Sequence, residues 1–116
     1  MNNEQRALWA GLYVLAGLWT KKDESILLLN VPDYPNDLNA CFRDFEPKLY
    51  ATMDISSIEF LREGDVRFEI NYWTGKNFTD SYGISVIEGK GNTYSEAFTN
   101  AVDKIIQPDT PIKTKD

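Results

Sequence analysis

The stretch SSIEFLREGDVRFEINYWTGKNFTDSYGISVIEG, residues 56–89, decides the fold class, because apolar and polar residues alternate along most of it. Ile58 and Phe60 lie two apart and share one face of a first predicted strand. A second predicted strand has four apolar residues on one face: Val66, Phe68, Ile70 and Tyr72. A third predicted strand has three: Tyr82, Ile84 and Val86. The segments REGD and TGKN contain glycine and have the length of hairpin connections. We therefore predict a three-stranded antiparallel sheet.

The other face of this sheet is predicted to be polar. It would carry Glu59, Arg67, Glu69 and Asn71. Antiparallel sheets often have one face against the core and one face toward water. We therefore expect helices to cover the apolar face and the polar face to be wholly or partly open.

The segment after the sheet, GKGNTYSEAFTNAVDKII, predicts a closing helix. Thr93 and Glu96 have the spacing of a capping box. A buried stripe follows at helical spacing: Phe98, Ala101, Val102 and Ile105. Residues 108–116, PDTPIKTKD, are polar and contain two prolines, so we predict a flexible C-terminal tail there.

Before the sheet, the segment VPDYPNDLNACF, residues 31–42, combines a turn with the start of a helix. Pro32 and Pro35 push the residues before them out of the helical region. Asn36 is the predicted N-cap, and Pro47 is expected to end the helix early. One face of this helix is predicted to be buried: Leu38, Cys41, Phe42 and Phe45.

Four acidic residues lie in or near this segment: Asp33, Asp37, Asp44 and Glu46. Helix capping and a solvated helix face explain them without a ligand. A carboxylate metal site is the alternative, but the spacing of a calcium-binding EF-hand loop is absent from the sequence. We favour the structural explanation.

The N-terminal run ALWAGLYVLAGLW, residues 7–19, has no charged residue. Glu4 and the missing cleavage site argue against a signal peptide, and the run is shorter than the ~20 residues that span a bilayer. We predict a helix buried on most of its circumference, in which Gly11 and Gly17 allow close approach of a neighbour. The next apolar run, SILLLN, is predicted to be a short strand.

Length and composition limit the possible functions. A chain of 116 residues is long enough for one hydrophobic core, so we predict one domain over residues 1–107. A net charge of −6 with scattered basic residues disfavours nucleic-acid binding. The chain has no histidine, which excludes the common histidine-based nucleophile pairs and zinc sites. The single cysteine, Cys41, makes a reducing cytoplasm the simpler location.

Two groups of residues carry a resemblance to a known family. The first is Pro32, Tyr34, Asp37, Leu38, Ala40, Cys41 and Phe42, and the second is Gly91, Thr93, Ala97 and Ala101. Together they resemble the phage ABA sandwich domain family, over residues 31–106 and more loosely over YVLAGLW. Pro35 stands where that family favours serine, Phe42 replaces a common tryptophan, and Pro47 interrupts the helix. The resemblance implies a phage or prophage context, and it brings no catalytic residues with it.

The expected fold is thus a small α+β sandwich, with a three-stranded antiparallel sheet packed by two or three helices in the order α-α-β-β-β-α. This order also resembles the double-stranded RNA-binding arrangement, but that arrangement needs a basic face, which the sequence does not provide.

Three functions remain open. The first is a non-enzymatic protein without cofactor that acts by protein contact, for example by inhibiting a host or defence factor, with self-association left open. The second is a small-molecule or nucleotide-binding domain that uses aromatic residues near a sheet edge: Tyr72, Trp73, Phe78 and Tyr94. The third is a divalent-metal hydrolase that uses carboxylates: Asp54, Glu59, Glu63 and Asp65. We favour the first.

Overall fold

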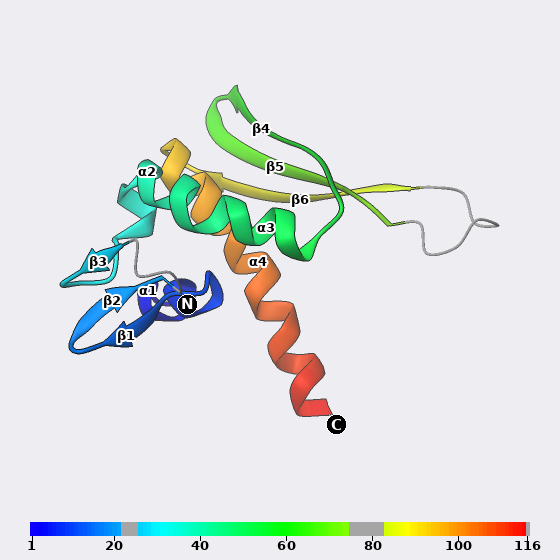
Figure 1. The fold of residues 1–116 in the computed structure, drawn as a ribbon. Coiled ribbons are helices and arrows are strands. Elements are labelled where there is room, and N and C mark those ends of the chain that lie inside the picture. The colour runs from blue at the N-terminus through cyan, green and yellow to red at the C-terminus, as the bar shows by residue number, and fades with distance from the viewer. Residues whose placement is uncertain (22–25, 75–82, 116) are drawn as a thin grey trace.

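The structure is a computed structural model that describes residues 1–21, 26–74 and 83–115; of residues 107–115 only the helical backbone is described. Helices and two three-stranded antiparallel sheets form an α+β fold, as predicted (Figure 1). The predicted order of elements is wrong at the N-terminal end. There a second small sheet takes the place of most of the first predicted helix.

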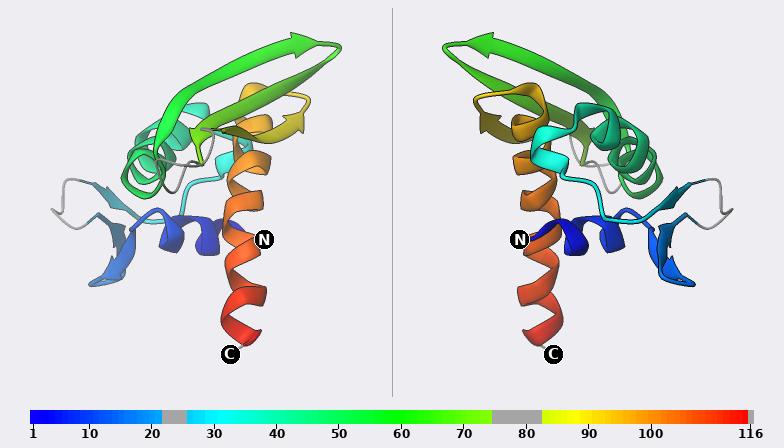
Figure 2. Two further views of the ribbon diagram at one scale, coloured as in Figure 1. Left: turned by 90° about the vertical axis from the view of Figure 1, so that its right-hand side faces the viewer. Right: turned by 90° about the vertical axis from the view of Figure 1, so that its left-hand side faces the viewer.

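The larger sheet consists of β4 (Ile55–Glu63), β5 (Asp65–Trp73) and β6 (Ile84–Gly91), in the order β4-β5-β6. This confirms the three predicted antiparallel strands and the hairpin at REGD, where Gly64 has a φ of +87°. TGKN and Tyr82 lie outside the described residues. In all views the helices lie on one side of this sheet and leave the other side uncovered (Figures 1 and 2).

The register of β6 corrects one prediction. Ile70 pairs with Ile87 and Phe68 pairs with Gly89, so Ile87 and Gly89 face the core. Ile84 and Val86, which were predicted on the core face, belong to the opposite face. Apolar residues occupy both alternating sets of positions in this strand, so the period of two could not decide which set is buried.

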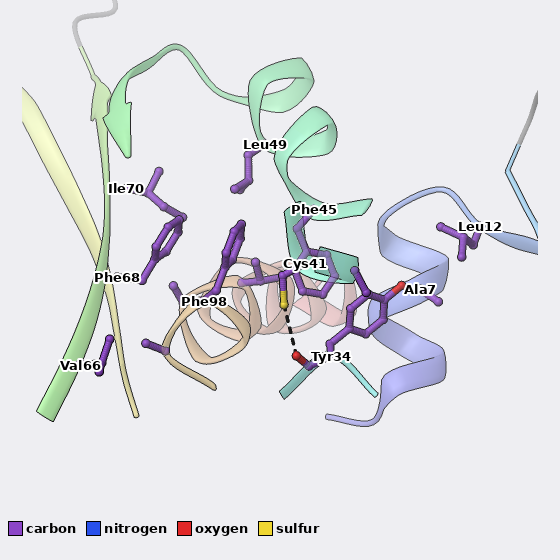
Figure 3. Packing of buried hydrophobic residues seen from close by; sticks show 14 residues of the cluster. Ala7, Leu12, Tyr34, Cys41, Phe45, Leu49, Val66, Phe68, Ile70 and Phe98 are labelled. Atoms are coloured by element: carbon purple, nitrogen blue, oxygen red, sulfur yellow. Dashed lines mark hydrogen bonds between the residues drawn. The ribbon is translucent and has the colours of Figure 1, made fainter. Parts of the chain in front are cut away.

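Helix α4 (Tyr94–Lys115) covers the core face of the sheet. A Cβ atom at Gly89 would overlap with the backbone of Ala97 and Ala101, so glycine permits close contact between β6 and α4. Next to this contact, Phe98 stacks on Phe68 with ring centroids 4.1 Å apart (Figure 3).

The start of α4 agrees with the predicted cap in part. The Glu96 amide donates to Oγ1 of Thr93 at 3.2 Å, but the Glu96 carboxylate accepts from the Asn92 amide at 2.7 Å rather than from the amide of Thr93. The helical backbone continues through residues 108–115, where a tail was predicted. The division into a domain over 1–107 and a flexible tail stays a prediction.

The segment before the sheet contains four short helical elements: η1 (Tyr34–Asn36), α2 (Leu38–Ala40), the π-helical turn η2 (Cys41–Phe45) and α3 (Glu46–Thr52). The N-cap of α2 is Asp37, whose Oδ1 accepts a hydrogen bond from the Ala40 amide at 3.0 Å. The prediction of Asn36 as the cap is therefore wrong by one residue, because Asn36 belongs to the preceding η1.

Pro47 does not end the helix, contrary to prediction, because it occupies the first turn of α3. In a regular α-helix the Arg43 carbonyl would accept from the amide of residue 47, and proline has no N–H to donate. The preceding turn is π-helical, and the ammonium of Lys21 donates to the Arg43 carbonyl at 2.8 Å. A side chain from another element thus satisfies this carbonyl.

The N-terminal region differs most from the prediction. Helix α1 (Asn3–Trp9) is followed by β1 (Tyr13–Leu15), β2 (Leu18–Thr20) and β3 (Leu27–Leu28), in the order β1-β2-β3. Positive φ values at Ala16 (53°) and Gly17 (83°) are those of a type I′ turn between β1 and β2. A Cβ at Gly11 or Gly17 would meet no atom within 4 Å, so these glycines serve the backbone turns and not the predicted close packing. The short strand predicted in SILLLN is confirmed as β3.

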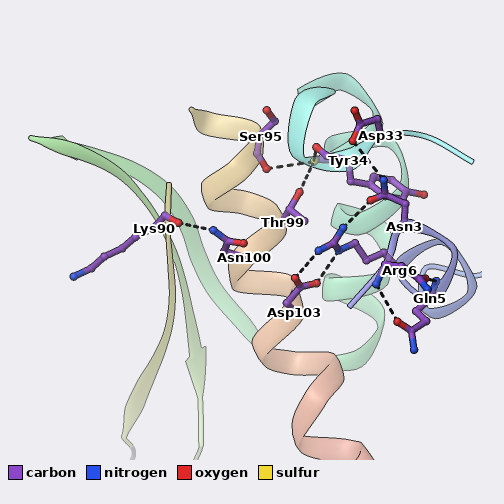
Figure 4. Close-up of polar contacts among 12 residues, drawn as sticks. Asn3, Gln5, Arg6, Asp33, Tyr34, Lys90, Ser95, Thr99, Asn100 and Asp103 are labelled. Carbon is purple, nitrogen blue, oxygen red and sulfur yellow. Dashed lines mark hydrogen bonds and ion pairs between the residues drawn. The ribbon is translucent and has the colours of Figure 1, made fainter. Parts of the chain in front are cut away.

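An ion pair joins α1 to α4. The Arg6 guanidinium donates to both carboxylate oxygens of Asp103, at 2.9 and 2.8 Å, and to Oδ1 of Asn3 at 2.7 Å (Figure 4). Ala7 and Leu12 complete the attachment, because both are buried in the same hydrophobic cluster as Phe98. In the part of the chain that the structure describes, no helix is long and apolar enough to cross a bilayer.

Candidate functional site

One carboxylate, that of Asp44, is completely buried. Its Oδ2 accepts hydrogen bonds from the Tyr34 hydroxyl at 2.9 Å and from Nη2 of Arg43 at 2.8 Å. Its Oδ1 accepts from Nε of Arg43 at 2.7 Å and lies 3.4 Å from the Lys21 ammonium. The prediction that Asp44 belongs to a solvated helix face is therefore wrong. The sequence did contain a signal, since position 44 follows the buried Cys41 by three residues and so falls on the buried stripe.

Two cations, Arg43 and Lys21, lie against the Asp44 carboxylate. Burial by itself raises the pKa of a carboxyl group, but hydrogen bonds from Arg43 and Tyr34 and the charges of Arg43 and Lys21 outweigh it, so the pKa of Asp44 is lowered. Burial, together with the charge of Asp44, raises the pKa of Tyr34 far above its ordinary value. Asp44 therefore stays ionised and Tyr34 stays protonated near neutral pH. With its oxygens occupied by protein donors, Asp44 holds η1, η2 and Lys21 together and serves as a structural group.

The thiol of Cys41 is completely buried, which confirms its predicted place on the inner helix face. Its Sγ donates to the Tyr34 carbonyl oxygen at 3.2 Å (Figure 3). The same Sγ lies 3.6 Å from Oγ1 of Thr99. Burial raises the pKa of Cys41 to about 11. A buried, protonated thiol is a poor nucleophile, so this arrangement does not support cysteine-based catalysis.

Local bonds also explain two other members of the acidic group. Asp37 caps α2, and Asp33 accepts hydrogen bonds from Asn36 at 2.9 Å and from Asn3 at 3.4 Å. In the described ranges, no group of three or more cysteine and carboxylate side chains is placed to hold a metal ion.

The structure does not bring the predicted aromatic residues together. Tyr72 and Trp73 are neighbours on β5 and therefore face opposite sides of the sheet. Tyr94 packs on Phe60, with ring centroids 4.8 Å apart. Because Phe60 pairs with Phe68, Tyr94 lies about 13 Å along β5 from Tyr72, at ~3.3 Å per residue. Phe78 lies outside the described residues.

The predicted catalytic carboxylates are also dispersed. Asp54 precedes β4, Glu59 lies in the middle of that strand, and Glu63 pairs with Asp65 at the far end of the hairpin. Asp54 and Glu63 are nine positions apart along extended chain, about 30 Å at ~3.3 Å per residue. These four residues do not form a common site.

The uncovered face of the β4-β5-β6 sheet is the remaining candidate site. We call it the open face. It consists of five rows of cross-strand neighbours: Glu63 and Asp65; Leu61, Arg67 and Lys90; Glu59, Glu69 and Glu88; Ser57, Asn71 and Val86; and Trp73 with Ile84. This placement confirms the sequence prediction for Glu59, Arg67, Glu69 and Asn71. Two hydrogen bonds join residues of this face across the strands. One runs from Nδ2 of Asn71 to Oγ of Ser57 at 3.2 Å and the other from Nη1 of Arg67 to Oε2 of Glu88 at 3.3 Å.

The open face has an apolar end. Trp73, at the end of β5, is 42% exposed. Ile84 and Val86 of β6 are 50% and 52% exposed. Trp73 and Ile84 are directly opposite one another, and Val86 follows Ile84 on the same face. Of these residues the sequence predicted only Trp73 as a binding residue. The exposure of Ile84 and Val86 could have been predicted from Gly89. Gly89 lies on the same face of β6 as Ile87, and a glycine in a strand often marks the face that another element approaches closely.

A second group of exposed apolar side chains belongs to the N-terminal part of the chain: Leu8, Val14, Leu15, Leu27 and Leu29. These residues come from α1, the small sheet and the residue after β3. The small sheet lies apart from the larger one (Figure 1). Substitutions in this second group can therefore serve as controls for substitutions of exposed apolar residues on the open face.

Comparison with models of known protein families, with curated protein sequences and with solved structures finds no match to this chain.

Proposed function

We propose that this protein acts without catalysis, by binding another protein through the open face. The observation that carries the proposal is the placement of Trp73, Ile84 and Val86 on a sheet face that the helices leave uncovered. Contiguous exposed apolar residues with polar neighbours are typical of protein-interaction sites. A sheet of three long strands also presents them on a stiff backbone, which limits the entropy lost on binding.

The buried groups support the non-catalytic part of the proposal. The carboxylate, phenol and thiol with shifted pKa values are those of Asp44, Tyr34 and Cys41, and all three are buried with protein partners. Catalytic groups have to reach a substrate, and these three are closed off from solvent.

The biological context of the proposal comes from the sequence. The resemblance to the phage ABA sandwich domain family supports a phage or prophage protein, and with it the role of an inhibitor of a host or defence factor. The net charge of −6 supports a protein partner over a nucleic acid. The single buried cysteine is compatible with work in the bacterial cytoplasm.

A pull-down from a bacterial lysate tests the proposal with matched variants. Ile84→Thr/Val86→Thr removes apolar surface and keeps the β-branched shape that suits a strand. Leu27→Thr/Leu29→Thr makes a comparable change in the second exposed group. We expect the first double variant to lose a protein that the wild type and the second double variant retain, with melting curves showing all three proteins folded. Equal retention by the two double variants, or equal loss, would contradict the proposal.

A further inference from the structure

We infer that the partner of the open face presents a basic segment: Lys or Arg side chains opposite Glu59, Glu69 and Glu88, and an apolar side chain opposite Ile84 and Val86. This inference rests on the proposed function and specifies the chemistry of the partner. It follows from the register of the sheet, from the charges next to the glutamates and from the spacing between the two kinds of surface.

The three glutamates form one continuous row. Glu59 of β4 pairs with Glu69 of β5, and Glu69 pairs with Glu88 of β6. Side chains directly opposite one another on neighbouring strands lie about 5 Å apart at their Cβ atoms. The row therefore places three carboxylates side by side in the middle of the open face, where like charges repel one another.

Cations of the same face engage only one end of this row. Nη1 of Arg67 lies 3.3 Å from Oε2 of Glu88, and the Lys90 ammonium lies 3.8 Å from Oε1 of Glu88. Arg67 also lies 3.7 Å from the carboxylate of Glu63 at the hairpin end. Within the described part of the chain, neither Glu59 nor Glu69 forms an ion pair. Two carboxylates thus remain for positive charges from outside the protein.

The same charges disfavour a second copy of this chain as the occupant. If two open faces met, their glutamate rows would approach each other and double the number of adjacent carboxylates. Like charges brought together across an interface oppose binding. A basic partner has the opposite effect, because its cations relieve the repulsion that already exists within the row.

The spacing on the face defines the partner further. Val86 and Glu88 are two residues apart on β6, about 7 Å along the strand. An extended segment with an apolar residue and a basic residue in alternate positions matches this distance, because its own side chains repeat at the same interval. The expected motif is therefore apolar-x-basic, with a second apolar residue two positions earlier for Ile84.

A titration with a defined peptide tests the inference. The probe is the seven-residue peptide Thr-Leu-Thr-Leu-Thr-Lys-Thr, and its counterpart carries Gln in place of Lys. We expect the Lys peptide to shift backbone amide NMR signals of β4, β5 and β6, and to bind roughly two- to fivefold more tightly than the Gln peptide, with a preference that weakens as salt is added.

Matched variants distinguish an effect of the glutamate row from an effect of the protein's net negative charge. Glu59→Gln/Glu69→Gln should abolish the preference for the Lys peptide. Glu4→Gln/Glu46→Gln removes the same amount of charge from α1 and α3, outside the open face, and should retain the preference. The row variant should also melt at the same temperature as the wild type or higher, because like-charge repulsion is relieved. Equal binding of the two peptides, no binding of either, or equal effects of the two variants would overturn the inference.

The pull-down distinguishes failure of the inference from failure of the proposed function. A partner that depends on Ile84 and Val86 but is retained by Glu59→Gln/Glu69→Gln would refute the basic partner and leave the proposed function standing. A partner retained by both Ile84→Thr/Val86→Thr and Glu59→Gln/Glu69→Gln would refute the inference and the proposed function together.

Discussion

The hydroxyl of Tyr34 donates a 2.9 Å hydrogen bond to the carboxylate of Asp44, and both side chains are completely buried. The two residues lie ten positions apart, on either side of the turn that introduces the π-helical segment. Arg43 and Lys21 supply the positive charge that Asp44 needs inside the protein. This bond therefore connects the stability of the turn to that of the helical segment behind it.

Replacing Tyr34 by Phe removes this donor and keeps the ring. A hydrogen bond to a buried charge contributes about 1.5–3 kcal/mol, so Tyr34→Phe should lower the free energy of unfolding by that amount in urea titrations. Tyr50→Phe is the control, since Tyr50 is exposed and should change stability by less than about 0.5 kcal/mol. Equal changes in unfolding free energy for the two substitutions would show that the hydrogen bond from Tyr34 to Asp44 does not stabilise the folded protein.

The lowered pKa of Asp44 predicts a specific dependence on pH. The pKa of this carboxyl in the unfolded chain is about 3.9, and in the folded protein it is lower, so the folded state favours the ionised form. Its contribution to stability is fully present above about pH 5 and is lost as the pH falls toward the lowered pKa. The difference in unfolding free energy between wild type and Asp44→Asn should therefore shrink between pH 7 and pH 3. A difference that stays constant over this range would count against the ionised state of Asp44.

The contact at Gly89 predicts a large effect of one methyl group. Gly89→Ala would push a Cβ into the backbone of Ala97 and Ala101, which cannot move aside as a flexible side chain can. We expect a loss of at least about 1–3 kcal/mol in chemical denaturation. At Gly91 the new Cβ would meet Cβ, Cγ and Oε1 of Glu96 at 2.8 Å. Rotation of the Glu96 side chain moves Cγ and Oε1, and a small shift at the end of β6 has to relieve the contact with Cβ, so Gly91→Ala should cost about 1 kcal/mol from the disturbed cap. Reversal of this order would refute the close packing of β6 on α4.

The β1–β2 turn predicts a stabilising substitution. Ala16 has a φ of 53°, which costs an L-residue with a Cβ roughly 1–2 kcal/mol, and asparagine tolerates this conformation better. Ala16→Asn should raise the unfolding free energy by about 0.5–1 kcal/mol, because Asn-Gly is a preferred type I′ pair. Gly17→Ala should lower it. A destabilised Ala16→Asn protein would indicate that residues 7–19 do not form the hairpin.

The cap of α2 predicts which of two neighbouring residues matters more. Asp37→Ala should cost about 0.5–2 kcal/mol, because Oδ1 of Asp37 accepts the Ala40 amide at 3.0 Å. Asn36→Ala removes only an exposed hydrogen bond to Asp33 and should cost less. Melting temperatures of the two variants decide between them, and a larger loss for Asn36→Ala would restore the assignment that the sequence favoured.

The sequence alone predicted the features that follow from local periodicity. Val66, Phe68 and Ile70 alternate with polar residues, and this alternation suits a strand that is buried on one side. Thr93 and the residues of α4 follow helical spacing, and Gly64 follows from the glycine that a tight hairpin requires. The polar content of the open face was predicted for the same reason, since a period of two assigns both faces at once.

Tertiary structure decided what local pattern leaves ambiguous. Residues 7–19 are apolar at every period, so helix and hairpin were both compatible with them until the positive φ values at Gly11, Ala16 and Gly17 assigned the turns. β6 has apolar residues in both sets of alternating positions, and only the approach of α4 to Gly89 buries Ile87 and leaves Ile84 and Val86 exposed. The charge of Asp44 is tolerated inside the protein because Tyr34 and Lys21 reach it from distant parts of the chain. Contacts between residues far apart in sequence set these outcomes, and a pattern within one segment carries no record of them.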